Sequence, residues 1–287
     1  MTPTTLMPSS RSRLERSDSV LSNVRALAFI AKKKMHLPVD WKARARRLVP
    51  TPVLNGAFLR FPRLYETRLV AYESHLSEGG RIELLAQLDL VSELEGDIVE
   101  CGSAHCGTSI VMARHAVSRG MNKVVFACDT YQGFDPTELA QERAKGLTVD
   151  GVPATAFTST SIHYVRSKIA ALRLERTVIP VKGLFQETLP GLPGPFALAF
   201  VDCDLRDSLL FAGTTIWPKL SPGGRVVFDD YTNAASKGAR DGVELFVKAF
   251  ETEIEDHGLL GRLYYAVKAR GSKLAVQAGR QTSAQLT

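Results

Sequence analysis

The stretch FALAFVDCDLRDSLLFAG, residues 196–213, contains the pattern on which the fold depends. A continuous apolar run ends at Asp202 and Asp204, and a segment with helical spacing of apolar residues follows it. Continuous apolar runs of this kind are typical of parallel strands, because both faces of a parallel sheet are buried. The order recurs downstream, where GGRVVFDD (223–230) ends at Asp229 and Asp230 before another helical segment. The sequence therefore predicts repeated βα units.

Three more strand-like runs lie upstream of this stretch. Helical segments follow the first two, and a Gly/Pro-rich link follows the third. The three runs are GDIVECG (96–102), NKVVFACD (122–129) and TVIPVKG (177–183). Five βα units predict an α/β fold with a doubly wound, Rossmann-like sheet. Near the end of the chain, LYYAVKA (263–269) and KLAVQA (273–278) flank the turn signal RGS and predict an antiparallel hairpin.

The positive charge of the chain is concentrated at its front. The 287 residues carry a net charge of +6, whereas residues 1–60 alone contain 12 Lys or Arg and 3 Asp or Glu. We expect a basic extension at 1–63, partly disordered or helical, before one large domain at 64–287. The extension is interpreted as a solvated or dimerisation arm. A nucleic-acid or acidic membrane surface is the alternative, but the aromatic residues of a base-stacking surface are missing from it.

Cysteine usage and hydropathy predict a reduced, cytoplasmic protein without a membrane span. The four cysteines lie at or near the ends of apolar runs, which predicts packed thiols, and their spacing does not match a zinc site. No apolar segment approaches the roughly 20 residues that a membrane helix needs. The first residues lack the apolar core of a secretory signal.

Acidic residues gather where the predicted strands end. Six of them fall at the carboxyl ends of four strands: Glu100, Asp129, Asp202, Asp204, Asp229 and Asp230. Ligands of doubly wound sheets bind at that edge. Like charges so close together are unfavourable unless a cation is bound among them. Ordinary helix capping is the alternative, and it explains one acid per strand well but two per strand poorly.

The first strand-to-helix turn, ECGSAHCGTS (100–109), predicts a nucleoside cofactor. Its glycines, Gly102 and Gly107, allow backbone to approach a ligand closely. Asp129, at the end of the next strand, can accept hydrogen bonds from both ribose hydroxyls. The turn is not the glycine-rich cradle that a pyrophosphate requires. S-adenosylmethionine, which has no phosphate, fits better, and Glu100 suits its ammonium group.

Residues from about 64 to 250 resemble the TylF/MycF-type macrocin O-methyltransferases, metal-dependent enzymes that methylate sugar hydroxyls of natural products. The matching pieces are GDIVECGSAHCG, FACDTYQGF, VIPVKGLFQETLP, FVDCDLRDS, LSPGGRVVFDDY and GARDGVELF. The resemblance implies a class I fold that binds S-adenosylmethionine and Mg²⁺. Arg206 departs from the pattern, because the family usually has tyrosine there, and SAHC (103–106) also differs.

Residue by residue, the resemblance implies three groups of site residues. The expected Mg²⁺ ligands are Asp202, Asp229 and Asp230. The expected general base is Asp204, with Asp202 as the alternative. The expected cofactor residues are Glu100, Gly102, Ser103, Gly107, Thr108, Asp129, Thr130, Gly183, Phe185, Gln186 and Asp202, of which Gly183, Phe185 and Gln186 would line the adenine pocket.

Together these features predict a Mg²⁺- and S-adenosylmethionine-dependent O-methyltransferase of natural-product biosynthesis, acting on a vicinal diol of a sugar or phenolic small molecule. A hard cation with oxygen ligands can stabilise one of two neighbouring hydroxyls as an alkoxide. Residues 130–160 are expected to form a lid over the acceptor, and the protein is expected to be a homo-oligomer. Two alternatives stay open: a methyltransferase of RNA or another macromolecule that uses the basic arm, and a non-catalytic interaction protein that keeps the fold.

Overall fold

The computed structural model describes residues 73–147, 153–234 and 236–271, all within the unit that extends from Arg68 to Thr287. The predicted basic extension and the KLAVQA segment lie outside these residues. Among the helices described, none is long and apolar enough to cross a membrane.

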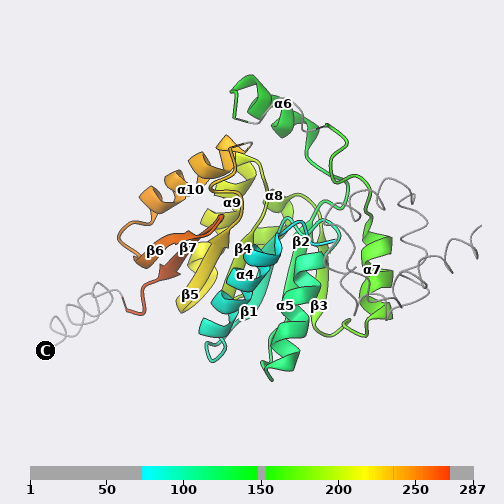
Figure 1. The fold of residues 1–287 in the computed structure, drawn as a ribbon, viewed down its shortest axis with the longest axis vertical. Coiled ribbons are helices and arrows are strands. Elements are labelled where there is room, and N and C mark those ends of the chain that lie inside the picture. Colours follow the sequence, from blue (N-terminus) through cyan, green and yellow to red (C-terminus); the bar gives the residue numbers. More distant parts are fainter. Residues whose placement is uncertain (1–72, 148–152, 235, 272–287) are drawn as a thin grey trace, which may run out of the picture. The chain divides into compact units, whose positions relative to one another are not determined.

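The described residues form a seven-stranded mixed sheet with the order β3-β2-β1-β4-β5-β7-β6 (Figure 1). The strands are β1 Asp97–Cys101, β2 Val125–Asp129, β3 Val178–Lys182, β4 Phe196–Val201, β5 Leu220–Phe228, β6 Ile254–Leu260 and β7 Leu263–Lys268. The first five are parallel to one another, and β7 runs antiparallel to β5 and β6. The predicted doubly wound α/β fold is confirmed. Strand order reverses between β1 and β4, which places the ligand edge of such a sheet there.

Helices cover both faces of this sheet because the strand residues alternate between two cores. The helices are α4 Glu78–Leu90, α5 Gly107–Ser118, α6 Pro136–Ala144, α7 Ile162–Ala171, α8 Phe185–Thr188, α9 Arg206–Ile216 and α10 Lys237–Ala249. One core joins α4, α5 and α7 to residues such as Ile98, and the other joins α9 and α10 to residues such as Val99. β4 is buried throughout, as its apolar run predicts.

The C-terminal antiparallel hairpin is present, but the predicted pairing of its strands is wrong. LYYAVKA contains β7, and both edges of β7 are already occupied, by β5 and by β6. The strand that pairs with β7 in the hairpin is β6, which precedes β7 in the chain and for which no strand was predicted. Only Gly261 and Arg262 connect the two strands, since Leu260 pairs with Leu263.

Residues 130–160, predicted as a long irregular segment, contain the helix α6. Asp135 caps this helix, accepting hydrogen bonds from the backbone N–H of Thr137 at 2.8 Å and of Glu138 at 2.9 Å. Pro136 occupies its first turn, where a missing N–H costs nothing. In Figure 1, α6 lies apart from the helices that cover the sheet.

Candidate functional site

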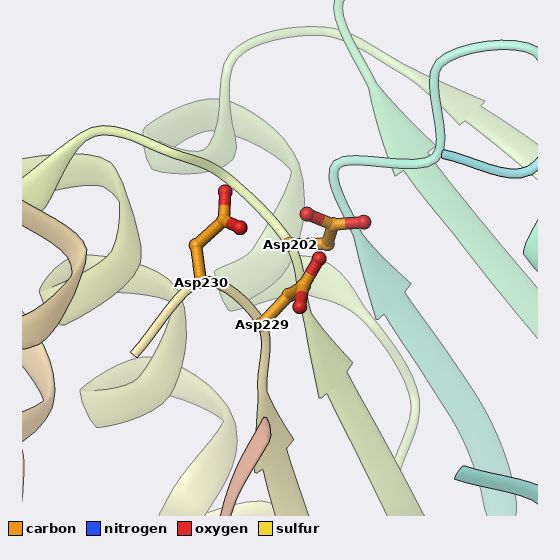
Figure 2. Close-up of side chains that lie close together, drawn as sticks. All are labelled: Asp202, Asp229 and Asp230. Atoms are coloured by element: carbon orange, nitrogen blue, oxygen red, sulfur yellow. The ribbon is translucent and has the colours of Figure 1, made fainter. Parts of the chain in front are cut away.

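Three carboxyl groups meet beyond the ends of β4 and β5. One oxygen each from Asp202, Asp229 and Asp230 lies within 4.8 Å of the others, and Figure 2 shows the three side chains converging from two loops. The strands bring them together because Val201 pairs with Phe228 and the acids directly follow that pair. The arrangement offers three oxygen ligands, the donor set that Mg²⁺ prefers.

The loop that carries Asp202 packs tightly on the first strand-to-helix turn. The Asp202 backbone N–H donates to the Cys101 carbonyl at 2.8 Å. A Cβ on Gly102 would lie 1.9 Å from the Asp202 carbonyl oxygen, and Gly102 has a φ of +92°. Only glycine therefore allows this contact between the predicted cofactor turn and the predicted metal ligand.

The shifted pKa values of these acids show how strongly the site disfavours unbalanced negative charge. Burial, followed by repulsion from Asp230, raises the pKa of Asp229 to about 6 despite the opposing effect of Arg262. Burial and then repulsion from Asp229 hold the pKa of Asp202 well above its usual range. The pKa of Asp204 is raised in the same way, first by burial and then by repulsion from Asp230.

The sequence did not predict the cationic side chain that reaches these acids. Arg262, in the turn between β6 and β7, donates from Nε to Asp229 Oδ1 at 2.9 Å and from Nη2 to Asp229 Oδ2 at 3.1 Å. Nη2 also contacts Asp230 Oδ1. Gly261 suits the first position of a two-residue hairpin turn, but β6 lacks the alternating apolar pattern that would have marked the hairpin in the sequence.

The acids open into a cleft with about 900 Å³ of empty space, including its mouth. Ten of the predicted site residues line this cleft: Gly102, Asp129, Thr130, Gly183, Phe185, Gln186, Asp202, Asp204, Asp229 and Asp230. The cleft spans the ends of β1, β2, β3, β4 and β5, so residues distant in sequence share one cavity. Its lining combines aromatic side chains with converging polar groups, as small-molecule sites commonly do.

Four predicted cofactor residues lie beneath the cleft and do not line it, so their cofactor contacts stay predictions. Ser103 donates its hydroxyl proton to Tyr131 Oη at 3.1 Å, and Thr108 Oγ1 lies 2.8 Å from Ser74 Oγ. Gly107 packs under the backbone of residues 73–74, where a Cβ would lie only 2.3 Å from Ser74 N. Glu100 is buried, and Ser109 Oγ donates to its Oε2.

Glu100 and Asp129 differ in how their carboxyl groups are held. Burial raises the pKa of Glu100 to about 8, against the smaller opposing effect of the Ser109 hydroxyl. Asp129 accepts backbone N–H groups from Ala104 at 2.8 Å and from Tyr131 at 2.6 Å. Asp129 is therefore fixed at the cleft wall and also holds the predicted cofactor turn.

One part of the cleft wall is aromatic. Phe157 makes edge-to-face contacts with Phe134, at 5.3 Å between ring centroids, and with His75, at 5.0 Å. All three residues line the cleft, and two of them belong to the predicted lid segment. An apolar ring or sugar face could pack against this wall.

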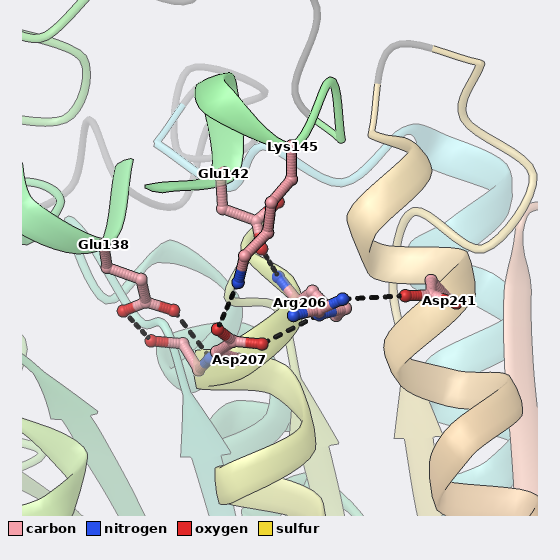
Figure 3. Close-up of polar contacts among 7 residues, drawn as sticks. Glu138, Glu142, Lys145, Arg206, Asp207 and Asp241 are labelled. Atoms are coloured by element: carbon pink, nitrogen blue, oxygen red, sulfur yellow. Dashed lines mark hydrogen bonds and ion pairs between the residues drawn. The ribbon is translucent and has the colours of Figure 1, made fainter. Parts of the chain in front are cut away.

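Carboxylates of α6 cap the N-terminus of α9 (Figure 3). Glu138 accepts the backbone N–H of Ser208 at 2.7 Å and its hydroxyl at 2.6 Å, and Glu142 accepts the backbone N–H of Arg206 at 2.9 Å. The N-cap residue of α9 is Leu205, which has no side-chain cap to offer. These contacts dock α6 at the rim of the cleft.

Arg206, which departs from the family pattern, does not line the cleft. Its Nε donates to Asp207 at 2.8 Å and its Nη1 to Asp241 at 3.3 Å, so it links α9 to α10 (Figure 3). Lys145, just after α6, joins the same network through Asp207 at 3.3 Å.

Comparison with known proteins gives the family. A family model described as macrocin-O-methyltransferase (TylF) matches residues 82–256. The chain belongs to the TylF family. The matched region contains all six acids at the strand ends, but it stops before Arg262 and begins after His75.

A curated relative from Streptomyces olivaceus is 31% identical over 157 residues. It is named 8-demethyl-8-(2,3-dimethoxy-alpha-L-rhamnosyl)-tetracenomycin-C 4'-O-methyltransferase. The match covers 52% of this chain and 58% of the relative, so the chain spans little more than half of that protein's length.

Solved structures share the TylF-family fold. The O-methyltransferase NovP has a TM-score of 0.58 at 22% identity, with 69% of this chain and 83% of NovP covered. The calicheamicin methyltransferase CalS11 has a TM-score of 0.54 at 17% identity, with 81% of this chain and 94% of CalS11 covered. At these identities the likeness concerns the fold alone.

Proposed function

We propose that this chain is an S-adenosylmethionine-dependent O-methyltransferase that uses a divalent cation, Mg²⁺ first of all, to methylate a hydroxyl of a sugar-bearing or phenolic natural product. The observation that carries the proposal is the cluster of Asp202, Asp229 and Asp230 inside the cleft. A scaffold protein has no use for acids such as Asp202 and Asp229, whose pKa values are raised by burial and then by repulsion from neighbouring acids. Membership of the TylF family supports the same chemistry.

The three acids fit a divalent cation in donor type and placement. All offer carboxylate oxygens, and Asp229 and Asp230 are nearly inaccessible to solvent while Asp202 faces the cleft. When bound there, the cation would lower the pKa of an acceptor hydroxyl. A vicinal diol suits such a site, because three carboxylates leave further ligand positions for oxygen.

Asp204 is the proposed general base. It lines the cleft two residues beyond Asp202 and adopts a φ of 60°, in the left-handed region that residues other than glycine rarely occupy. Its raised pKa makes the carboxylate a stronger proton acceptor than an ordinary aspartate. In the proposed reaction Asp204 takes the proton of the acceptor hydroxyl, and Asp202 remains the alternative base.

The ends of β1, β2 and β3 are the proposed binding site of S-adenosylmethionine, which supplies the methyl group. Asp129 would accept hydrogen bonds from the ribose hydroxyls, and Gly183, Phe185 and Gln186 would surround the adenine. All four line the cleft on the side away from β5. Glu100 would receive the ammonium group from below the turn.

The proposed acceptor lies between the acids and the aromatic wall. Phe134, Phe157 and His75 form a surface suited to an aglycone ring or a sugar face. The name of the Streptomyces olivaceus relative assigns methylation to the 4' oxygen of a dimethoxyrhamnosyl group, and a deoxysugar on a polyketide is the first acceptor to try. We propose residues 130–160 as the lid over it, with α6 as its rigid part.

Turnover tests the proposal directly. The protein is incubated with S-adenosylmethionine, Mg²⁺ and a panel of rhamnosylated polyketides and catechols, and mass spectrometry follows the gain of one methyl group. We expect EDTA to stop the reaction and added Mg²⁺ to restore it. Full activity in metal-free protein would refute the metal-dependent mechanism, and absence of any methylation together with no response to S-adenosylhomocysteine would refute the methyltransferase assignment.

One variant separates the proposed base from the proposed ligands. Asp204→Ala is expected to abolish turnover while calorimetry still detects Mg²⁺ binding. Asp229→Asn is the matched comparison, because this variant should lose both turnover and Mg²⁺ binding. Loss of Mg²⁺ binding in Asp204→Ala would instead place Asp204 among the ligands. In parallel, S-adenosylhomocysteine should raise the melting temperature and NAD should not, since only a ligand of the native state stabilises it.

A further inference from the structure

The acids of the candidate site already have a positive partner within the protein. Arg262 donates hydrogen bonds from two nitrogens to Asp229, at 2.9 and 3.1 Å, and one of these nitrogens also forms an ion pair with Asp230. The planar guanidinium matches a carboxylate in this two-point geometry, which a lysine cannot reproduce.

Among the described residues that line the cleft, Arg262 is also the one arginine or lysine, beside seven acidic side chains. Two of its nitrogens lie within hydrogen-bond distance of Asp229, so its charge acts directly on the acids. Two of the three proposed metal ligands are therefore neutralised in part by a side chain that the matched family region does not include.

A divalent cation and the guanidinium need the same oxygens. Arg262 occupies both oxygens of Asp229 and one of Asp230, so a cation ligated by these carboxylates would lie beside another positive charge. Repulsion between neighbouring like charges is strong where the surroundings exclude water. The two cations cannot both be bound at full strength.

The position of Arg262 lets it leave without disturbing the core. It sits in the two-residue turn between β6 and β7, next to Gly261, whose φ is +56°. Its side chain is 36% exposed, whereas those of Asp229 and Asp230 are 4% and 8% exposed. The acids are fixed and the arginine can swing into solvent.

We infer that Arg262 is a built-in counter-cation that occupies the Asp229–Asp230 carboxylates and is displaced when the divalent cation binds, so that it sets the metal affinity of the site. The inference rests on the proposed function, since it presumes a divalent cation at these acids. Arg262 is a positioning residue here. It holds the acids in place while no metal ion is bound, and it lowers the affinity of the site for the divalent cation.

Metal titration of full-length variants tests this role without any acceptor. Arg262→Met removes the charge and keeps the apolar part of the side chain. Arg262→Lys keeps the charge but cannot donate two hydrogen bonds to Asp229 in the same geometry. Arg240→Met is the matched control, because Arg240 pairs with Glu244 on the exposed face of α10, outside the cleft. Calorimetry at mildly alkaline pH measures Mg²⁺ and Mn²⁺ affinity, and circular dichroism checks folding.

The expected order of metal affinity is Arg262→Met, then Arg262→Lys, then the unmodified protein, which Arg240→Met should match. Coupling between two binding events on one protein typically changes an affinity by about 5- to 150-fold, and Arg262→Met should gain a factor within that range. Without metal the same variant should melt at a lower temperature, and Mg²⁺ should raise that temperature more than in the unmodified protein.

The possible failures are distinguishable. Unchanged or weaker Mg²⁺ binding by folded Arg262→Met overturns the inference while the metal-dependent function stands. If Arg262→Met does not fold, unchanged or weaker Mg²⁺ binding by Arg262→Lys overturns the inference in its place. If neither the unmodified protein nor any variant takes up a divalent cation, both the inference and the proposed metal dependence fail, and the response to S-adenosylhomocysteine still reports on cofactor binding.

Discussion

Replacing Glu138 by alanine should loosen α6 and weaken acceptor binding while leaving cofactor binding intact. Glu138 accepts both the backbone N–H and the hydroxyl of Ser208, at 2.7 and 2.6 Å, in the first turn of α9. Because Leu205 cannot cap α9, the cap comes from α6, a separate helix. Loss of this carboxylate removes a helix cap and a docking contact at once.

The magnitude follows from the contacts that are lost. A missing N-cap costs about 1 kcal/mol, and the net loss of the second hydrogen bond costs about 1 kcal/mol. The attraction of the charge to the helix N-terminus adds little, since Glu138 is partly exposed and solvent screens it. We expect the free energy of unfolding to fall by about 2 kcal/mol, which corresponds to roughly 4–8 °C in the melting temperature of a domain of this size.

Thermal melting and steady-state kinetics provide the assay. The acceptor KM should rise several-fold with kcat changed less, and the stabilisation by S-adenosylhomocysteine should stay the same. Glu138 lines the cleft, so Glu142→Ala is the necessary companion: Glu142 caps α9 through Arg206 N–H but lies outside the cleft. The reasoning is wrong if Glu138→Ala melts like the unmodified protein, or if only Glu138→Ala and not Glu142→Ala raises the acceptor KM.

Three further outcomes are expected. First, S-adenosylhomocysteine binding near neutral pH should release a proton, because burial raises the pKa of Glu100 to about 8 and pairing with the ligand's ammonium group would ionise this carboxyl group. Calorimetry in buffers of different ionisation enthalpy measures the proton release. Glu100→Gln should abolish the release. Second, Gly102→Ala should give insoluble or strongly destabilised protein, since the added Cβ would lie 1.9 Å from the Asp202 carbonyl oxygen. Comparing its expression yield and melting temperature with those of Gly120→Ala checks this, because a Cβ at position 120 meets no atom within 4 Å. Third, Lys168→Met should lower the free energy of unfolding by about 3 kcal/mol, because it leaves the Glu73 carboxylate without its buried ion-pair partner. Denaturant unfolding measures this change, and adding Glu73→Gln should recover part of the lost stability.

The sheet could be predicted from sequence because its parallel strands are buried on both faces. β4, for example, is buried at every position, so its pattern is continuous and apolar. β6 could not be found in this way: it is an edge strand whose residues are mostly exposed, and IEDHGLL carries three polar side chains. Helical spacing in the preceding segment then extended the predicted helix past the end of α10 at Ala249.

The helix α6 was missed although its start signal was present. Asp135, Pro136 and Glu138 form the cap, first-turn proline and early acid that are typical of a helix N-terminus. The segment is polar, however, with only Leu139 and Glu142 buried, so it lacks the apolar periodicity that identifies longer helices. Its stability comes instead from the contacts with α9, which no local pattern records.

The convergence of the acids followed from topology, whereas the charge that balances them did not. Ends of adjacent parallel strands must meet at one edge, so the sequence alone predicts that Asp202 and Asp229 lie together. Arg262 comes from an antiparallel hairpin whose partner strand was misassigned, and its long side chain crosses the end of β5. Its role depends on a turn and a side-chain direction, and hydrophobic periodicity reports neither.

Backbone strain gives independent support for the location of the site. Five of the seven non-glycine residues with positive φ among the described residues follow the ends of β1, β2, β4 or β5: Ala104, Cys106, Tyr131, Asp204 and Asp230. Such conformations cost on the order of 1 kcal/mol or more each and persist where the surroundings enforce them. Asp204 and Asp230 both have this backbone conformation and both line the cleft. The proposed base and one proposed ligand are therefore held in conformations that an ordinary loop avoids, as is expected where a site fixes its side chains.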